Sequence, residues 1–259
     1  MPLILLSNDD GIDAPYLEVT AEALEGLGDV ELYVVAPERE RSAVSHSITL
    51  HKPLRVDERA GKRFAVSGSP VDCVYVGMNK IVPRPPDLVV SGINRGYNLG
   101  ADVFYSGTVA AAVEGALRGT PAIALSLAPR ASDQIERATA FTAALARAVL
   151  SADGAHKTVL NVNFPAQIGR EYEWTCLGER VYHDVVDDRR DPRGRRYFWI
   201  GGGVAAAANP PGTDCHAVES GRVSVTPLFL DLTHRDMLAA PPAFSVAGYQ
   251  AAGSLRRAE

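Results

Sequence analysis

Near its start the chain reads Leu3-Ile4-Leu5-Leu6-Ser7-Asn8-Asp9-Asp10-Gly11, an unbroken apolar run followed by polar and turn-forming residues. An apolar run of this kind, without polar alternation, is typical of a strand buried on both faces of a parallel sheet. Apolar residues then recur at helical spacing over residues 17–27, and residues 30–36 form a second apolar run. This strand–helix–strand order predicts an α/β fold built on a parallel sheet.

The alternation of strands and helices continues to about residue 165. Strands or extended segments are predicted at residues 47–56, 63–67, 87–91, 122–126 and 158–162, and helices at 69–79, 109–118 and 132–150. Ser69 and Pro70 suit the N-cap and the first position of a helix, and Cys73 is expected in the core. We therefore predict a three-layer, Rossmann-like, mostly parallel sheet with a doubly wound core over residues 1–165.

The region after residue 165 has a different composition. Arg and Asp crowd into residues 187–196, residues 201–212 are rich in Ala, Gly and Pro, and residues 223–232 are strand-like. The last twenty residues are weakly helical in pattern. We interpret residues 166–259 as a C-terminal hairpin and arm extension that belongs to a single domain of residues 1–259.

Composition and charge narrow the class of protein. Hydrophobic residues make up 46% of the chain and charged residues 22%, as in ordinary globular proteins. A net charge of -5 without a long basic stretch argues against binding of duplex nucleic acid. The sequence has neither a membrane-spanning apolar run nor the basic segment of a signal peptide. Three cysteines without Cys-x-x-Cys spacing are expected to be reduced, so we expect a cytoplasmic protein.

Polar side chains follow three of the predicted strands. Asp9 and Asp10 follow the first strand, Ser42 lies in the loop after the second, and Asn94 and Asn98 lie in the glycine-rich loop after the third. Ligands of open parallel sheets bind beyond the carboxyl ends of the strands, so these loops are expected to converge. Their carboxylate, hydroxyl and amide oxygens are the ligands that Mg²⁺ and Mn²⁺ prefer. Taken alone, the residues after the first strand fit a turn and helix cap equally well.

A second group of residues suggests an anion site. Ser106-Gly107-Thr108 precedes an alanine-rich helix, and the free amides of a first helical turn suit a phosphate. Ordinary N-capping by Ser106 is the alternative. The loop over residues 92–100 matches neither the dinucleotide fingerprint nor the P-loop. Three histidines outside these groups are either acid–base candidates or solvated side chains: His46, His51 and His234.

Taken together, these motifs closely resemble the SurE family of stationary-phase survival proteins. The resemblance rests on Ser7-Asn8-Asp9-Asp10-Gly11, Ala36-Pro37, Arg41-Ser42, Gly68-Ser69-Pro70, Ser91-Gly92-Ile93-Asn94 with Gly96, Asn98 and Gly100, and Tyr105-Ser106-Gly107-Thr108-Val109. It continues through Asp191-Pro192-Arg193-Gly194, Trp199-Ile200-Gly201, Gly212-Thr213-Asp214 and Val223-Ser224-Val225-Thr226-Pro227. The alanine-rich residues 204–208 depart from the family pattern locally.

The resemblance implies a metal-dependent phosphomonoesterase that hydrolyses nucleoside 5′- and 3′-monophosphates, with short polyphosphate as a possible further substrate. It places the ligands of one Mg²⁺ or Mn²⁺ ion per subunit on Asp9, Asp10, Ser42 and Asn94. It places the substrate phosphate on Asn8, Asn98, Ser106, Gly107 and Thr108. Family members form dimers and often tetramers by exchanging C-terminal segments, so a homodimer or homotetramer is expected, with residues 166–259 in its contacts.

Three readings of the function remain open at the level of sequence. The first is the nucleotidase, in which Asp9 and Asp10 are the catalytic residues and a metal-activated water is favoured over direct attack by a carboxylate. The second is a non-catalytic sensor that binds a nucleotide or metal in the same pocket. The third, a metal-dependent sugar-nucleotide transferase, needs an acceptor site that the sequence does not reveal. The preferred base, the preferred ester and the physiological metal are not specified by the sequence.

Overall fold

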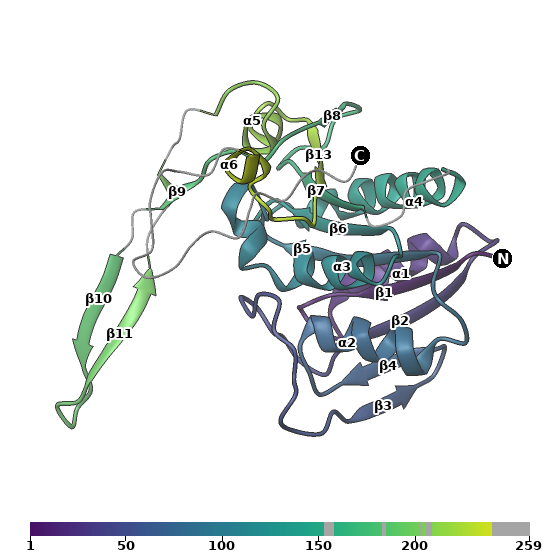
Figure 1. Cartoon of the computed structure of the whole chain (residues 1–259), viewed down its shortest axis with the longest axis horizontal. Helices are drawn as coiled ribbons and strands as arrows, with labels where there is room; N and C mark the ends of the chain where they lie inside the picture. The colour runs from purple at the N-terminus through teal and green to yellow at the C-terminus, as the bar shows by residue number, and fades with distance from the viewer. Residues whose placement is uncertain (153–157, 183–184, 202–203, 206–208, 240–259) are drawn as a thin grey trace. The chain divides into compact units, whose positions relative to one another are not determined.

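The computed structural model of the chain (Figure 1) describes residues 1–152, 158–182, 185–201, 204–205 and 209–239. By their internal contacts the residues divide into two units, 1–228 and 229–259. The described part of the second unit contains one short helix, α6 (Arg235–Ala239). None of the described helices is both long and apolar enough to cross a membrane.

The first unit is built on a nine-stranded sheet with the order β3-β4-β2-β1-β5-β6-β7-β13-β8. The strands are β1 (Leu3–Ser7), β2 (Glu31–Pro37), β3 (Val56–Arg59), β4 (Arg63–Val66), β5 (Leu88–Arg95), β6 (Ala122–Leu127), β7 (Val159–Phe164), β8 (Tyr172–Trp174) and β13 (Val223–Leu228). From β4 to β7 all neighbours are parallel, whereas β3 and β13 each pair antiparallel with β4 and β7 respectively. The prediction of a mostly parallel sheet is confirmed.

Helices cover both faces of this sheet, which gives three layers (Figure 1). On one face α1 (Pro15–Glu25) packs against α4 (Ile135–Ser151), and on the other α2 (Pro70–Val76) packs against α3 (Gly107–Leu117). All five residues of β1 are buried because helices lie over both of its sides. This is why the sequence of β1 is continuously apolar rather than alternating.

The remaining described elements follow β7. A helix, α5 (Asp214–Glu219), packs against β13. β10 (Val185–Arg190) and β11 (Arg196–Gly201) form an antiparallel hairpin of their own, and β9 (Val181–Tyr182) pairs with β12 (Val204–Ala205). Residues after 165 thus supply the predicted hairpin, and they also add β13 and β8 to the main sheet.

Several local predictions are confirmed. Ser69 caps α2 in a capping box, because its hydroxyl accepts the amide hydrogen of Asp72 while the Asp72 carboxylate accepts that of Ser69. Pro70 occupies the first helical position, and Cys73 is completely buried. The helix is shorter than predicted, since the α-helical turns end at Val76 and continue as a π-helix over Gly77–Ile81.

Two predictions about extended segments are wrong in their bounds. Residues 47–55 are not a strand, because β4 is already paired on its outer side by β3, which begins at Val56. The third predicted strand does not stop at residue 91, since β5 runs on to Arg95 with Ile93 buried in the core. Asn94 therefore lies in a strand, beyond a register shift against β6, and not in the glycine-rich loop. The predicted helicity of the last twenty residues falls outside the described residues.

Candidate active site

The turn after β1 is shaped by Asn8 and Gly11. The Asn8 amide donates to the Gly11 carbonyl at 2.9 Å, and the Gly11 N–H donates to Asn8 Oδ1 at 3.1 Å. Gly11 has a φ of +105°, and a Cβ there would lie 3.1 Å from the Arg39 carbonyl carbon, so only glycine fits without strain. Asn8, predicted to contact substrate, thus serves the turn that presents Asp9 and Asp10.

Asp9 is a buried carboxylate, with only 5% of its surface exposed. Its Oδ1 accepts a hydrogen bond of 2.6 Å from the hydroxyl of Thr108, at the first turn of α3. Burial raises the pKa of Asp9 to about 6, because it outweighs the hydrogen bond from Thr108, which lowers the pKa; the charge of neighbouring Asp10 adds a smaller upward effect. The site therefore lacks positive charge around this carboxylate.

The carboxylate of Asp10 also has too little positive charge around it to offset its burial. Its Oδ2 is buried and has no hydrogen-bond partner. Burial raises the pKa of Asp10 as well, against the opposing charge of Arg95 and with the added repulsion of Glu40. Two adjacent carboxylates with raised pKa values and an unpartnered oxygen fit a bound cation, which would satisfy both.

The neutral members of the predicted metal set come from β5 and from the loop after β2. Among the described residues no three His, Cys, Asp or Glu side chains cluster as a metal site, so Ser42 and Asn94 are needed to complete one. The amide nitrogen of Asn94 donates to the Gly96 carbonyl at 3.0 Å, which leaves its oxygen as the atom for a cation. The exposed Ser42 hydroxyl donates to a carboxylate oxygen of Glu40 at 2.8 Å.

Main-chain contacts bring these segments to Asp9. The N–H of Arg41, next to Ser42, donates to the Asp9 carbonyl at 2.7 Å. Ser7 at the end of β1 pairs in register with Ser91 of β5, so the turn with Asp9 and the last residues of β5, including Asn94, extend beyond this pair on adjacent strands. The segments of the four predicted ligands thus lie at the same edge of the sheet, while the Ser42 hydroxyl itself is turned to Glu40.

The predicted phosphate site lies at the N-terminus of α3. Ser106 is the N-cap, since its hydroxyl accepts the N–H of Val109 at 3.1 Å. A Cβ on Gly107 would lie 3.1 Å from Asp9 Oδ2, so the glycine allows the helix to start directly against this carboxylate. Thr108 is fully buried and bonded to Asp9. The start of α3 thus lies directly against Asp9.

Asn98 has a different environment from the other predicted phosphate ligands. Its side-chain nitrogen donates to Ser126 Oγ at 2.7 Å. Its main-chain carbonyl accepts hydrogen bonds from the side-chain amides of Asn161 at 2.8 Å and Asn163 at 3.1 Å. Sequence reasoning missed this buried polar group on β6 and β7. The alternation of Asn with apolar residues in Val159–Phe164 is the signal that could have revealed it.

The histidines also have distinct surroundings. His46 Nε2 lies 3.2 Å from Glu114 Oε2 on α3, a contact that the sequence analysis did not identify. His51 is exposed. The ring of His234 accepts the N–H of Met237 at 3.0 Å in α6. Among the described residues no hydrogen bond or ion pair joins His46 or His51 to Asp9 or Asp10.

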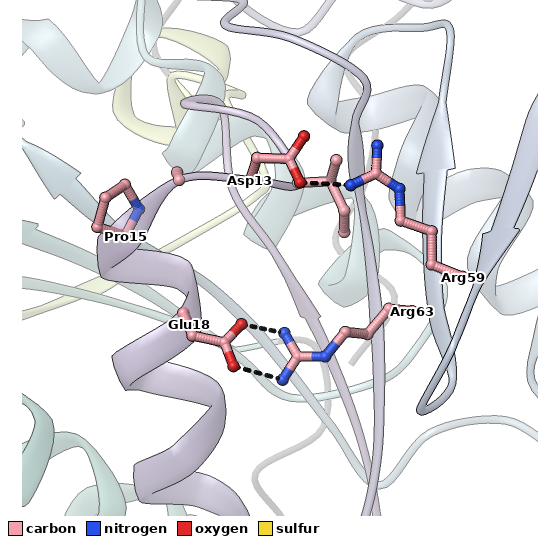
Figure 2. A pocket seen from close by; sticks show the side chains of 7 residues that line it. Asp13, Pro15, Glu18, Arg59 and Arg63 are labelled. Atoms are coloured by element: carbon pink, nitrogen blue, oxygen red, sulfur yellow. Dashed lines mark hydrogen bonds and ion pairs between the residues drawn. The ribbon is translucent and has the colours of Figure 1, made fainter.

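A cavity of about 370 Å³ opens beside the start of α1 and is shown in Figure 2. Arg59 forms an ion pair with Asp13 there, and Arg63 donates to both carboxylate oxygens of Glu18, at 2.5 and 3.1 Å. Every charge on these side chains is matched by its neighbour. None of the predicted metal or phosphate ligands lines this cavity, so it is separate from the candidate active site.

Comparisons with known proteins identify the family of the chain. The family model "Survival protein SurE" matches residues 4–184. A 5′-nucleotidase SurE of Anaeromyxobacter sp. (strain Fw109-5) is 49% identical over 250 residues, 95% of this chain and 97% of the relative. Another, from Geobacter sulfurreducens, is 51% identical over 235 residues, 89% of each chain. The crystal structure of a SurE protein from Aquifex aeolicus superposes with a TM-score of 0.81 at 38% identity, covering 93% of this chain and 98% of that one. The chain belongs to the SurE family.

Proposed function

We propose that this protein is a divalent-metal-dependent 5′-nucleotidase. It hydrolyses nucleoside 5′- and 3′-monophosphates to a nucleoside and phosphate, with short polyphosphate as a further substrate. The observation that carries the proposal is Asp9, a buried carboxylate that is bonded to Thr108 at the N-terminus of α3. The relatives that are named 5′-nucleotidases support the same activity.

The proposal includes one Mg²⁺ or Mn²⁺ ion per subunit, held by Asp9, Asp10, Ser42 and Asn94. Such an ion supplies Lewis-acid polarisation of the phosphate and a more acidic water. Support comes from the donor set, all oxygen atoms of a kind that these hard cations prefer, and from the unpartnered Oδ2 of Asp10.

The chain's own residues have two proposed tasks. The first turn of α3 and its hydroxyls, with Asn8 and Asn98, orient the phosphate: Ser106, Gly107 and Thr108 lie where a helix N-terminus favours an anion. Asp9 and Asp10 are the catalytic carboxylates. A carboxylate next to the metal-bound water would accept the proton that this water loses on attack.

The proposal extends to assembly and location. We propose a homodimer or homotetramer in the cytoplasm, with residues 166–259 contributing to the contacts between subunits. The exposed aromatic residues of β11 support this part, since Phe198 and Trp199 are more than half exposed on the single chain. Light scattering coupled to size-exclusion chromatography measures the subunit number directly.

Phosphate release from a panel of nucleoside 5′- and 3′-monophosphates tests the activity. We expect release that EDTA abolishes and that Mg²⁺ or Mn²⁺ restores. Saturable nucleotide binding without any release, under every divalent ion tried, would contradict the enzyme and favour the nucleotide sensor. The same panel ranks the bases and esters as substrates.

A further inference from the structure

The loop after β2 carries Ser42 and has to hold it near two carboxylates of another loop. We call residues 38–46 the Ser42 loop. Ala43 and Ser45 in it have φ values of +54° and +53°, which side-chain-bearing residues rarely adopt. Such a conformation persists only where surrounding contacts fix it. The contacts that hold the Ser42 loop in this conformation therefore also hold Ser42 in place.

Two neighbouring residues of the loop make these contacts. The N–H of Ser45 donates to the Tyr105 carbonyl at 3.1 Å, and its hydroxyl donates to the Phe104 carbonyl at 2.6 Å. The next residue, His46, places Nε2 3.2 Å from Glu114 Oε2. The loop is thus joined to the segment before α3 and to α3 itself, across more than fifty positions of sequence.

Glu114 is a well-fixed partner for His46. Its side chain is 8% exposed, and its other oxygen accepts a 2.6 Å hydrogen bond from Arg118, whose guanidinium lies 4.0 Å from the Tyr75 ring centre. Burial acts to raise the pKa of Glu114, but hydrogen bonds from His46 and Arg118 outweigh it and the pKa is lowered. Glu114 is therefore an anion with one oxygen directed to each partner.

One helix is consequently bonded to both halves of the predicted metal set. Thr108 in the first turn of α3 binds Asp9, and Glu114, further along the same helix, binds His46 of the Ser42 loop. Because a helix is rigid over so short a span, α3 fixes the Ser42 loop relative to Asp9. The Arg41 N–H bonds directly to the Asp9 carbonyl on one side of Ser42, and the contact of His46 with Glu114 fixes the loop on the other side.

We propose that His46 is a positioning residue, which through Glu114 holds the Ser42 loop where Ser42 can share a cation with Asp9 and Asp10. The inference rests on the metal site of the proposed function. It assigns to His46 no contact with substrate or metal. It predicts that loss of the His46 contact weakens metal binding before it affects turnover by the loaded enzyme.

Mn²⁺ binding to the metal-stripped, full-length protein tests the proposal, with the free ion followed by electron paramagnetic resonance. His46→Ala should weaken Mn²⁺ binding about tenfold, as losses of outer contacts to metal ligands commonly do. His46→Gln should retain most of the affinity, because its amide nitrogen reaches a similar point and can donate to Glu114. His51→Ala is the matched control, since His51 is exposed a few residues after the Ser42 loop and makes no hydrogen bond or ion pair with the described residues. In kinetics, His46→Ala should raise the Mn²⁺ concentration for half-activation and leave kcat at saturating metal within about twofold of wild type.

Each other outcome has a distinct meaning. Equal Mn²⁺ affinity in wild type and His46→Ala would overturn the positioning role and leave the proposed function standing. An equal loss of Mn²⁺ affinity in His46→Ala and His46→Gln would also overturn the positioning role, since the second variant retains a hydrogen-bond donor. Wild-type protein that binds no Mn²⁺ would overturn the role together with the metal site. Thermal unfolding of each variant establishes that it is folded before it is titrated.

Discussion

The hydroxyl of Thr108 donates to Oδ1 of Asp9 at 2.6 Å and thereby joins the first turn of α3 to the turn after β1. Both side chains are buried, so the bond forms away from competing water. It is the direct contact between the predicted metal-binding and phosphate-binding groups. Substitutions at its two ends separate the roles of these groups.

Asp9→Asn should reduce phosphate release by about a thousandfold or more, because it removes charge where a cation and a proton have to be held. The fold should persist, since asparagine has the same shape and can still accept from Thr108. Steady-state kinetics with a nucleoside monophosphate gives the measurement. Asp13→Asn is the control, because Asp13 is exposed and pairs with Arg59 outside the site. Wild-type turnover in Asp9→Asn would remove Asp9 from the site.

Thr108→Val should cost about 1–3 kcal/mol of unfolding free energy, because a buried carboxylate loses its hydrogen-bond donor. Thr108→Ser keeps a hydroxyl and should recover most of this loss. Urea unfolding of the metal-stripped variants supplies the comparison. Valine and serine variants of equal stability would show that the hydroxyl contributes little.

Asp9 should also make stability depend on pH. In the metal-stripped protein the folded-state pKa of Asp9 is about 6, above its ordinary 3.8, so the folded state retains a proton longer than the unfolded state. Its contribution is therefore full below pH 4 and is lost as the pH rises through 6. Between pH 4.5 and 7.5 the loss amounts to about 2 kcal/mol.

Other carboxylates, such as Glu114 with its lowered pKa, act in the opposite sense. The informative quantity is therefore the difference in unfolding free energy between wild type and Asp9→Asn at the two pH values. We expect the stability of Asp9→Asn relative to wild type to increase as the pH rises. A difference that stays constant would show that the pKa of Asp9 is not raised in solution.

Gly115→Ala should destabilise the protein by about 1–3 kcal/mol, although alanine is the better helix former. A Cβ at this position of α3 would come within 2.7 Å of Val89 Cγ2 on β5, so the helix would be pushed from the sheet. The double variant Gly115→Ala, Val89→Ala tests the cause. It should be more stable than the sum of the two single changes predicts.

One thiol should react with a disulfide reagent in the native protein at pH 8, and three after unfolding. Cys176 is exposed, whereas Cys73 and Cys215 are buried. Burial raises the pKa of Cys215 to about 12 and that of Cys73 well above its usual range, so neither forms a thiolate at this pH. Cys176→Ser should abolish the native reaction, and a remaining fast thiol would contradict the burial of the other two.

Much of the fold follows from local sequence. The apolar run of β1, the Ser69 cap of α2 and the hairpin of β10 and β11 all have short-range signals. The strand order has no such short-range signal. β13 pairs with β7, which lies about sixty positions earlier in the chain, and no local pattern specifies that partner. Asn94 was assigned to a loop because glycines surround it, whereas burial of Ile93 extends the strand.

The candidate site divides in the same way. Strand ends and helix starts are visible in sequence, and they predict the positions of Asp9, Asp10 and the Ser106 cap. No local pattern predicts the contact of His46 with Glu114, since it depends on how α3 packs beside the Ser42 loop. Glutamate in a helix and histidine in a loop are ordinary surface residues until the packing of the two segments is known.

The place of β13 has a consequence for biosynthesis. In the sheet β7 lies between β6 and β13, and β13 (Val223–Leu228) is synthesised about sixty residues after β7. Until then the growing chain presents the open edge of β7, whose buried asparagines have no covering strand. The nascent protein therefore exposes an unpaired strand edge from the synthesis of β7 to that of β13, and the main sheet is completed only when it gains this antiparallel neighbour.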